Sequence, residues 1–446
     1  MNIQSLPRLK EIRQALKGRG IVWFGTRGID ALEIYPLARP VLITAQIAPV
    51  PPVQLDGAQQ DNLELRSRLR RDLDLYDVDR DPGLDAVGLK TEFLAQINAP
   101  VVLVAYRAME LLCRPSFCHP TLVMATPFHL LQRQFEYKPW VEQQLLRLEG
   151  VPVLKSIFVR DGDVDAISSF LANGPSVGRC STSSGGSGVF PFATEEEYFE
   201  RLPSHPDGFV GLTPLLDRAA PLNVNACVYS TGEVAVFGVS FQLIGVRGLT
   251  RRTFGFCGND FGAASDVPPE ICDRIESCAE TIGRWLFQYG YRGVFGLDIL
   301  WNEGKLYVTE VNPRFQASTP LSAGINQTLG FPDPMTEHIA AFLGLGAPTK
   351  VPVAEQTRAC GELRGRKPIA QVVHRNISTA RLRAAEIHED LVPGGVSIVG
   401  APESGIYIER EAMLFKSLHC ERITADGYSV SEPVHAVKKA VTVAAY

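Results

Sequence analysis

The sequence predicts an α/β protein, α+β in part, built as three consecutive domains, and three observations support this class. The first third alternates short apolar runs with charged, helix-like segments, as in an open α/β sheet. From Lys138 onward, strands and glycine-rich turns surround one strong amphipathic helix. A linker at 348–352 then precedes a region of short strands and mixed helices. We expect an N-terminal α/β domain (1–135), a central domain (136–347) and a small C-terminal α/β domain (348–446).

Composition excludes several functional classes. A chain of 446 residues with 45% hydrophobic and 21% charged content can bury the cores of two or three domains. Its net charge of -5 gives no overall attraction to nucleic acid or to an anionic membrane. It has neither the apolar core of a signal peptide nor an apolar stretch of ~20 residues. We therefore predict a cytoplasmic protein that binds no nucleic acid and no membrane.

The cysteines indicate free thiols in a reducing compartment. The nine cysteines contain no CxxC pair, and no clustered histidine completes a zinc site. Buried, unreactive thiols are the expected state.

The N-terminal domain is predicted from its apolar runs. They indicate strands over 21–28, 40–48, 100–106 and 120–126. Residues 61–76 have helix-like spacing. Because open α/β sheets bind ligands at strand ends, Arg27, in the TRG that ends the first run, is a candidate substrate-binding residue. A solvated loop arginine is the alternative reading.

A helix and a hairpin dominate the central domain. Residues 269–291 place Ile271, Ile275 and Ile282 on one helical stripe, and Gly290 is a natural stop. The next segment, GVFGLDILWNEGKLYVTEVNPRF (293–315), predicts two strands joined by a turn.

The register of this hairpin depends on the turn. A two-residue turn at 303–304 would place Asp298 opposite Thr309, whereas a three-residue turn at 303–305 would place it opposite Glu310. In the second register the two carboxylates lie ~5 Å apart at Cβ and repel unless a cation lies between them. The oxygens of Asp298, Glu310 and Asn312 suit Mg²⁺, and Arg314 follows them.

This run resembles the metal-binding hairpin of the ATP-grasp superfamily, in which an acid precedes an E-x-N-P-R run on the next strand. The resemblance implies an ATP-grasp fold with an N-terminal pre-ATP-grasp domain, and it implies ATP and Mg²⁺ as cofactors. Asp298, Glu310 and Asn312 would then be metal ligands. Arg314 would contact the transferring phosphate or the acyl phosphate as a catalytic residue.

The same resemblance implies a nucleotide site upstream. The small-residue loop STSSGGSGVF (181–190) corresponds to the family's glycine-rich loop, whose N–H groups close over phosphates. The implied ATP-binding residues are Lys138, Arg179, Ser183, Ser184, Gly185, Gly186, Ser187, Leu215 and Leu216. Asn223 and Asn225 stand where the family usually has a glutamate, which leaves the ribose and metal-side contacts open.

Substrate contacts are expected from two further loops. Arg252 is a second catalytic candidate, at the γ-phosphate or a substrate carboxylate, and Arg247 and Arg251 are substrate candidates. A solvated loop face is the alternative for these arginines. Ser318 and Thr319, after Arg314, supply hydroxyls that would orient an acceptor.

The activity implied by the resemblance is that of an ATP-dependent carboxylate–amine ligase acting through an acyl phosphate. With SSGGSGV, PLNVNACV and EVNPRFQAST, the chain is also similar to actinomycete peptide ligases of the pheganomycin type. The expected partners are an amino or guanidino acid donor and a peptide or amine acceptor in antibiotic biosynthesis. The chain would act alone or as a homodimer.

Two alternatives remain open. A carboxylate–thiol ligase would load the acid onto a carrier protein, which a large acidic groove would favour. A non-catalytic ATP-binding scaffold would have no reason to retain the paired acids, and replacing Glu310 by Gln would distinguish it from an enzyme.

Overall fold

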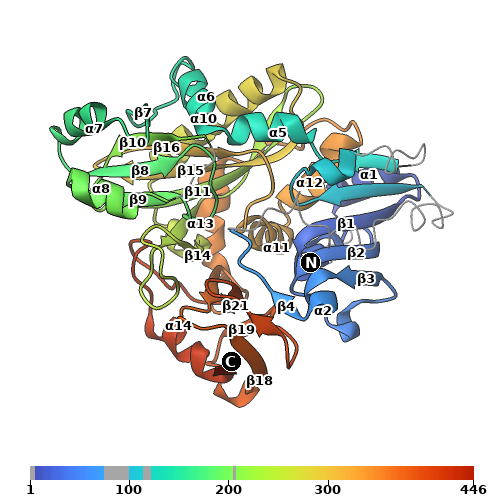
Figure 1. Ribbon diagram of the computed structural model, residues 1–446. Coiled ribbons are helices and arrows are strands. Elements are labelled where there is room, and N and C mark those ends of the chain that lie inside the picture. Colours follow the sequence, from blue (N-terminus) through green and yellow to red (C-terminus); the bar gives the residue numbers. More distant parts are fainter. Residues whose placement is uncertain (1–5, 75–99, 114–121, 204–206, 446) are drawn as a thin grey trace.

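The computed structural model describes residues 6–74, 100–113, 122–203 and 207–445, and it contains four β-sheets. Figure 1 shows the N-terminal sheet on one side, the central strands on the other and the C-terminal region below, with α11 (Thr319–Leu329) near the middle. In the described parts of the chain, no helix is long and apolar enough to span a bilayer.

The N-terminal sheet is parallel and has the order β3-β2-β1-β5-β6. Its strands are β1 (Gly20–Arg27), β2 (Pro40–Ile47), β3 (Gln59–Asn62), β5 (Val101–Ala105) and β6 (Leu122–Ala125). The four predicted apolar runs thus form strands, with residues 120 and 121 of the last run outside the described residues. The associated helical segments are α1 (Pro7–Leu16), η2 (Gly28–Ile34), η3 (Pro52–Gln54), η5 (Glu110–Cys113) and α5 (His129–Glu136).

The helix-like spacing over 61–76 was misleading beyond one short turn. Only α2 (Leu63–Ser67) is helical, capped by the side chain of Asn62. Arg68 then adopts a left-handed φ of 54°, and β4 (Leu69–Arg70) follows. The charged side chains after α2 are used in ion pairs rather than along a helix face, and residues 75 and 76 lie outside the described part.

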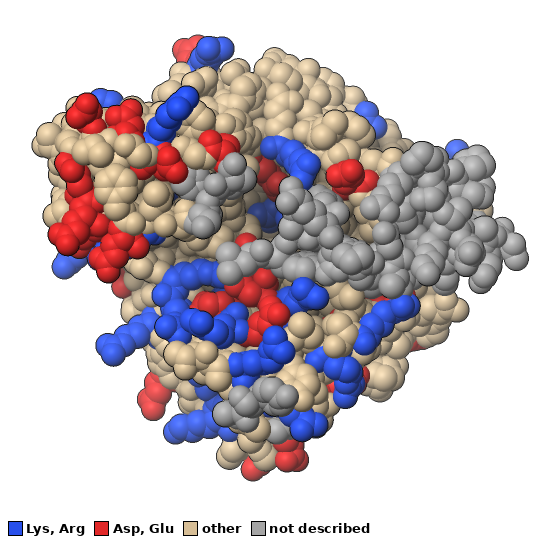
Figure 2. Space-filling model, in the orientation of Figure 1, with Lys and Arg blue, Asp and Glu red and all other residues tan. Residues whose placement is uncertain are grey.

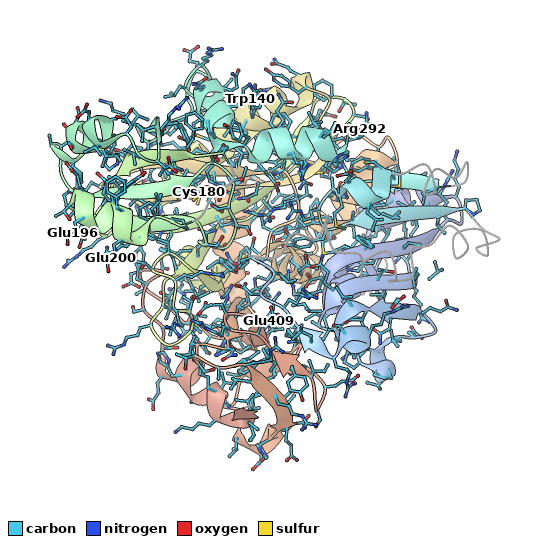
Figure 3. All side chains as sticks on the ribbon, in the orientation of Figure 1. Trp140, Cys180, Glu196, Glu200, Arg292 and Glu409 are labelled. Atoms are coloured by element: carbon cyan, nitrogen blue, oxygen red, sulfur yellow. The ribbon has the colours of Figure 1, made fainter. Side chains whose placement is uncertain are left out.

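The second sheet is antiparallel, with the order β7-β10-β8-β9. Its strands are β7 (Ile157–Arg160), β8 (Ser176–Cys180), β9 (Val189–Phe192) and β10 (Phe209–Pro214). The helices nearby are α6 (Lys138–Leu145), α7 (Val164–Leu171) and α8 (Glu195–Arg201). Glu196 and Glu200 of α8 lie at the outer end of this unit, whereas Cys180 ends β8 nearer the middle of the molecule (Figure 3).

The largest sheet joins central and C-terminal strands in the order β16-β15-β11-β13-β14-β17-β21-β19, with β12 paired to β11. Its strands are β11 (Ala220–Val228), β12 (Val234–Val236), β13 (Ser240–Ile244), β14 (Phe256–Asp260), β15 (Gly293–Asn302), β16 (Lys305–Asn312), β17 (Ala370–Arg375), β19 (Val396–Val399) and β21 (Met413–His419). Strands after residue 348 therefore continue the central sheet.

The fourth sheet, in the order β22-β18-β20-β4, adds N-terminal β4 to β18 (Leu382–Ile387), β20 (Tyr407–Ile408) and β22 (Val441–Ala445). The remaining helices are α9 (Phe261–Ala264), α10 (Pro269–Gln288), α12 (Pro334–Phe342), α13 (Val353–Cys360), η7 (Gly361–Leu363), η8 (Glu389–Leu391), α14 (Glu432–Ala436) and η9 (Val437–Ala440). The third and fourth sheets each contain strands from two of the three expected domains. The expected domains are therefore segments of the chain that share sheets.

An aromatic cluster fixes the junction between α5 and α6. Phe135 and Trp140 pack on Trp285 of α10, with ring centroids 5.0 and 5.7 Å away, and Tyr289 completes the cluster. Such packing stabilises beyond simple area burial. The charged side chains of Glu136 and Lys138, which flank this junction, therefore project from a rigid corner.

A buried ion pair connects the N-terminal segment to the C-terminal strands. Arg70 and Glu64 are both fully buried, with Arg70 Nε 2.6 Å from Glu64 Oε2. Arg70 Nη1 also donates to the carbonyl oxygens of Gly400, Met413 and Leu414 at 2.7–3.2 Å. One guanidinium thus satisfies acceptors from separate parts of the chain.

Replacing Arg70 by Met should strongly destabilise the fold, because it removes the cation beside the buried Glu64 carboxylate and the guanidinium that donates to three carbonyl groups. Loss of one partner of such a pair costs roughly 3–5 kcal/mol. Arg39→Gln, in the exposed Arg39–Asp56 pair, is the matched control and should cost at most ~1 kcal/mol. Thermal and urea unfolding measure both; equal effects would contradict the assigned role of Arg70.

His338 of α12 predicts a pH dependence of stability. Its Nδ1 accepts from Val294 N at 3.0 Å, its Nε2 contacts Ala125 O at 2.9 Å, and burial lowers its pKa to about 4. The folded state therefore binds fewer protons than the unfolded state between pH 6.5 and 4. Stability rises with pH through this window, by roughly 3 kcal/mol for this group.

His338→Gln should flatten that part of the pH profile, whatever its effect at pH 8. Urea unfolding of both proteins at pH 5 and pH 8 checks this. An unchanged slope would show that other groups set the acid sensitivity.

Candidate functional site

The hairpin of β15 and β16 has the two-residue turn of one predicted register and the Asp298–Glu310 pairing of the other. The turn has two residues, Glu303 and Gly304, both at positive φ (48° and 76°), and Asn302 pairs with Lys305. A bulge then adds Thr309 to β16, so that Asp298 pairs with Glu310 after all. Thr309 fills the irregularity by donating its hydroxyl to Asp298 O at 3.0 Å. The bulge brings the two carboxylates to the same face.

Four amide side chains, from β11, β13, β16 and the segment after β16, donate hydrogen bonds to Asp298. Its Oδ1 accepts from Asn223 Nδ2, Gln242 Nε2 and Gln316 Nε2 at 2.9, 2.8 and 3.1 Å. Its Oδ2 accepts from Asn312 Nδ2 at 3.1 Å. Burial, followed by the charge of Glu310, raises the pKa of Asp298 to about 6. These hydrogen bonds hold Asp298 opposite Glu310. They compensate only part of the negative charge of the two carboxylates.

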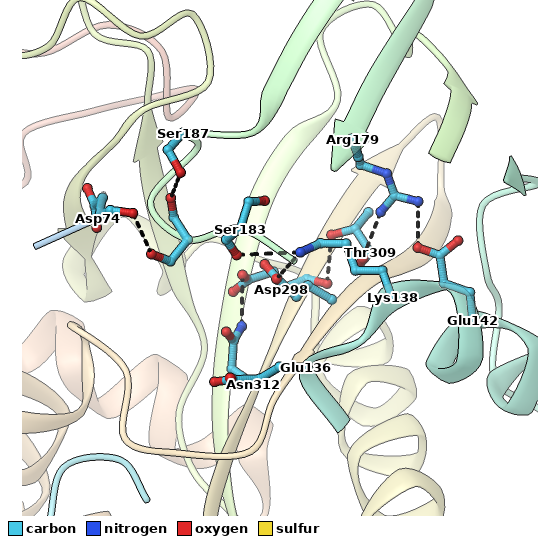
Figure 4. A network of polar contacts seen from close by, with 12 residues as sticks. Asp74, Glu136, Lys138, Glu142, Arg179, Ser183, Ser187, Asp298, Thr309 and Asn312 are labelled. Atoms are coloured by element: carbon cyan, nitrogen blue, oxygen red, sulfur yellow. Dashed lines mark hydrogen bonds and ion pairs between the residues drawn. The ribbon is translucent and has the colours of Figure 1, made fainter. Parts of the chain in front are cut away.

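The negative charge of Glu310 is compensated by Lys138, the first residue of α6. Lys138 Nζ lies 3.0 Å from Glu310 Oε1 and 3.5 Å from Ser183 O. Burial alone would raise the pKa of Glu310, but Lys138, with Arg314 and Arg179, lowers it below its ordinary value. One lysine therefore connects the hairpin with the small-residue loop (Figure 4).

Two arginines of the site are held by carboxylates on α5 and α6. Arg179 Nη2 lies 2.5 Å from Glu142 Oε1, and its Nη1 donates to Thr309 O at 3.1 Å (Figure 4). Arg314 Nε lies 3.3 Å from Glu136 Oε1, and its Nη2 donates to Asn312 Oδ1 at 3.0 Å. These contacts orient both guanidiniums toward the hairpin.

The loop after β8 turns tightly against the N-terminal segment. Gly185 and Gly186 have φ values of 56° and 79°, and a Cβ on Gly186 would lie 2.2 Å from Phe254 O. Ser184 Oγ donates to Asp74 O at 3.4 Å, and Ser187 Oγ donates to Ser184 O at 2.8 Å. Glycine is required here for both conformation and space.

These elements enclose one cavity of about 300 Å³. Of the residues predicted for the site, those that line it are Arg27, Ser184, Gly185, Gly186, Asp298, Glu310, Asn312, Arg314 and Ser318. Lys138 and Arg179 lie just behind this lining, through their contacts with Glu310 and Thr309. Figure 2 shows basic side chains gathered around a small acidic group near the middle of this face.

Other predicted residues lie elsewhere. Arg247 and Arg251 are exposed, and the hydroxyl of buried Thr319 donates to Asn225 Oδ1 at 2.7 Å. Leu215 is 41% exposed, its N–H donates to Pro175 O, and neither it nor Leu216 lines the cavity.

Arg252 is bound to the N-terminal segment. It forms ion pairs with Asp72 and Asp74, the latter at 2.8 Å, and Asp74 also lies 3.5 Å from Arg375 Nη2. Asp72 N donates to Glu409, which lies in the C-terminal region (Figure 3). The acidic residues Asp72 and Asp74 therefore lie against the loop that carries Arg252.

Sequence reasoning did not identify several of these residues. Asn223 stands directly opposite Asp298 in the β11–β15 pairing and also accepts from Ser318 Oγ at 2.7 Å. Gln242 and Gln316 carry no motif that marks them. For Asn223, the signal was its position where a glutamate is usual in the resembling family.

The donor set fits a magnesium ion. In the described part of the chain, no group of three or more His, Cys, Asp and Glu side chains could hold a metal. Asp298 and Glu310 instead offer two carboxylates face to face, with the amide of Asn312 beside them. Mg²⁺ is commonly held by one or two carboxylates, with water and phosphate oxygens completing its shell.

Comparisons with known proteins agree with this architecture. Residues 181–318 match the family profile described as an ATP-grasp domain. No curated protein sequence matches the chain significantly. The chain therefore contains an ATP-grasp domain.

Similar solved structures extend the likeness over the whole chain. The biotin carboxylase domain of 2-oxoglutarate carboxylase from Hydrogenobacter thermophilus is 14% identical, with a TM-score of 0.58 over 98% of this chain and 88% of that one. N5-carboxyaminoimidazole ribonucleotide synthetase from Thermotoga maritima is 14% identical, with a TM-score of 0.53 over 96% and 100%. Biotin carboxylase from Campylobacter jejuni is 13% identical, with a TM-score of 0.56 over 98% and 90%. The fold is the ATP-grasp fold.

Replacing Lys138 by Gln should destabilise the protein in a pH-dependent way. Without Lys138, the Glu310 carboxylate faces Asp298 uncompensated, and its pKa rises. The loss should be about 1–2 kcal/mol at pH 8, reduced by partial exposure, and should shrink toward pH 5 as both carboxylates take up protons. Urea unfolding at the two pH values measures it.

Lys350→Gln is the matched control, because Lys350 likewise pairs with glutamate, here Glu276 and Glu280, but is 64% exposed. Its effect should be small at both pH values. A Lys138→Gln effect that is equally small would contradict the charge balance described here.

Proposed function

We propose that this protein is an ATP-dependent carboxylate–amine ligase that forms an amide through an acyl phosphate, releasing ADP and phosphate. The observation that carries the proposal is the bulged hairpin, which places Asp298 opposite Glu310, with Asn312 and Arg314 beside them, on the wall of a cavity. A pair of carboxylates that repel each other is stable in a cavity when its ligand brings positive charge.

The proposed nucleotide site follows from the contacts around this pair. Asp298, Glu310 and Asn312 would hold magnesium, which when bound neutralises charge on the phosphates and polarises them. Lys138 and Arg179 would contact the phosphates. The loop formed by Ser183, Ser184, Gly185, Gly186 and Ser187 would close over them through its N–H groups. Adenine would lie near Leu215 and Leu216.

The reaction needs no nucleophile from the protein. An oxygen of the substrate carboxylate attacks the γ-phosphorus while the bond from this phosphorus to the ADP oxygen breaks. The amine nitrogen then attacks the acyl carbon, the carbon–oxygen bond to phosphate breaks, and the nitrogen loses a proton. Arg314 stabilises the transferring phosphoryl group. Arg252 would join it after releasing Asp72 and Asp74.

We further propose an amino or guanidino acid as donor and a peptide N-terminus as acceptor, in antibiotic biosynthesis. The lining of the cavity supports an amine acceptor over a carrier protein, because basic and apolar side chains stand in it beside the acids Asp72, Asp74 and Glu411. The basic and apolar side chains include Ile47, Tyr106, Arg107, Phe254, Phe256, Val373, Arg375 and Met413. Arg27 and Ser318 line the same space, whereas Arg247, Arg251 and Thr319 would act from its rim or from behind it.

The test is ADP release and hydroxamate formation with Mg-ATP, hydroxylamine and a pool of amino and guanidino acids. Glu310→Gln should lower the rate about 100-fold or more, because a neutral amide would hold the proposed magnesium ion, which offsets the phosphate charge, less tightly than the carboxylate does. Glu303→Gln, at the exposed turn of the same hairpin, is the control and should leave the rate unchanged. Thermal unfolding of each variant confirms that it folds.

Wild-type protein that forms hydroxamate at the same rate as Glu310→Gln would contradict the assignment of the hairpin. ADP formation without any dependence on an acid would show a different phosphoryl acceptor.

A further inference from the structure

The part of the cavity that faces the N-terminal sheet has no role in the phosphate chemistry proposed above. Three adjacent parallel strands, β2, β1 and β5, end there. The residues at or just beyond their carboxyl ends that line the cavity are Thr26, Arg27, Gln46, Ile47, Tyr106 and Arg107. Open α/β sheets bind ligands at this edge, so a substrate subsite is expected here.

Two arginines line this subsite, and they differ in how fully a neighbouring carboxylate neutralises their charge. Arg27 is buried, and both its Nε and its Nη2 contact the buried carboxylate of Asp30, at 3.2 and 2.7 Å. Its guanidinium also lies 5.4 Å from the ring centre of Tyr106. Arg27 is therefore already compensated within the fold.

Arg107 and Arg314 form ion pairs with the same carboxylate, that of Glu136. Arg107 Nη2 lies 3.3 Å from Glu136 Oε2, and Arg314 Nε lies 3.3 Å from Glu136 Oε1. One carboxylate thus holds two guanidiniums, both of which line the cavity. The three side chains together carry one net positive charge toward the cavity.

The donors of the two guanidiniums differ in availability. Arg314 already donates to Glu136, to Phe315 O and to Asn312 Oδ1. Arg107 Nε is buried and finds no acceptor among the described residues, and the side chain is 34% exposed. A buried donor without an acceptor favours a ligand that supplies one. Arg107 therefore has capacity for an anion that Arg314 lacks.

We propose that Arg107 binds the carboxylate of the substrate acid beside Arg314, and that Glu136 is a positioning residue for both guanidiniums. This proposal rests on the proposed function, and it assigns acid recognition to the N-terminal sheet. The carboxylate that attacks phosphorus must approach an anionic phosphate, and a guanidinium reduces that repulsion. Gln132 supports the arrangement, donating to Glu136 Oε1 at 3.1 Å and accepting from Ala108 N at 2.6 Å.

The test is the dependence of ADP release on acid and on ATP, measured separately. The probe is an equimolar pool of the twenty amino acids plus guanidinoacetate, followed by the single acid that gives hydroxamate. Arg107→Gln should raise the half-saturating acid concentration about 10- to 100-fold, as expected for loss of a charge-assisted hydrogen bond. The KM for ATP should stay within about twofold.

Three further variants separate recognition from structure. Arg107→Lys should recover part of the acid affinity, since the charge is retained. Glu136→Gln should raise the KM for the acid and also lower kcat, because Arg314 loses its orientation. Arg133→Gln, an exposed arginine on the same helix as Glu136, should change neither constant. Unfolding curves identify any variant that fails to fold, and Arg107→Lys then decides.

An unchanged KM for the acid in Arg107→Gln, with active wild-type protein, would overturn this proposal and leave the ligase assignment intact. A wild-type protein without acid-dependent ADP release would instead overturn the proposed function, and the subsite assignment with it.

Discussion

Two carboxylates that face each other across a β-hairpin are the constraint on which the rest of the site depends. Asp298 and Glu310 repel, so the fold must compensate them from outside the hairpin. Lys138 compensates Glu310, and amides from β11, β13 and the segment after β16 surround Asp298. Burial and, after it, the charge of Glu310 nevertheless raise the pKa of Asp298 to about 6. A cationic ligand would offset both effects by stabilising the ionised carboxylate.

The cations of the site are oriented in advance, each by a carboxylate. Arg179 is held by Glu142, Arg314 by Glu136, and Arg252 by the Asp72–Asp74 segment. These carboxylates come from helices and loops that belong to different parts of the chain, and the aromatic cluster fixes the helix corner that carries Glu136 and Lys138. Preorganised charge reduces the reorganisation that a reaction requires. The sheets that these parts of the chain share therefore bring the carboxylates and their cations to one cavity.

Much of this could be predicted from local sequence patterns. The apolar runs of the N-terminal sheet, the helix over 269–288, the hairpin and the small-residue loop all follow from short-range preferences. The helix prediction after Asn62 was wrong beyond Ser67, because the contacts of Arg70 with Glu64 and with the carbonyl groups of Gly400, Met413 and Leu414 outweigh helix preference there.

The partners of the site could not be predicted in the same way. Neither turn length alone gave the register, since the bulge at Thr309 decides it. Glu136, Glu142, Gln242 and Arg107 lie far from the hairpin in sequence, and nothing in their local pattern marks them. Long-range pairing places them, including the continuation of the central sheet by strands after residue 348.

Titration of ADP into the protein by calorimetry, with and without Mn²⁺, tests the central claim most directly. If the facing carboxylates hold a divalent cation on the nucleotide, Mn²⁺ should tighten ADP binding to the wild-type protein by about tenfold or more. That gain should largely disappear in Asp298→Asn, while metal-free ADP binding persists. An equal gain in both proteins would place the cation elsewhere and contradict this account of the hairpin.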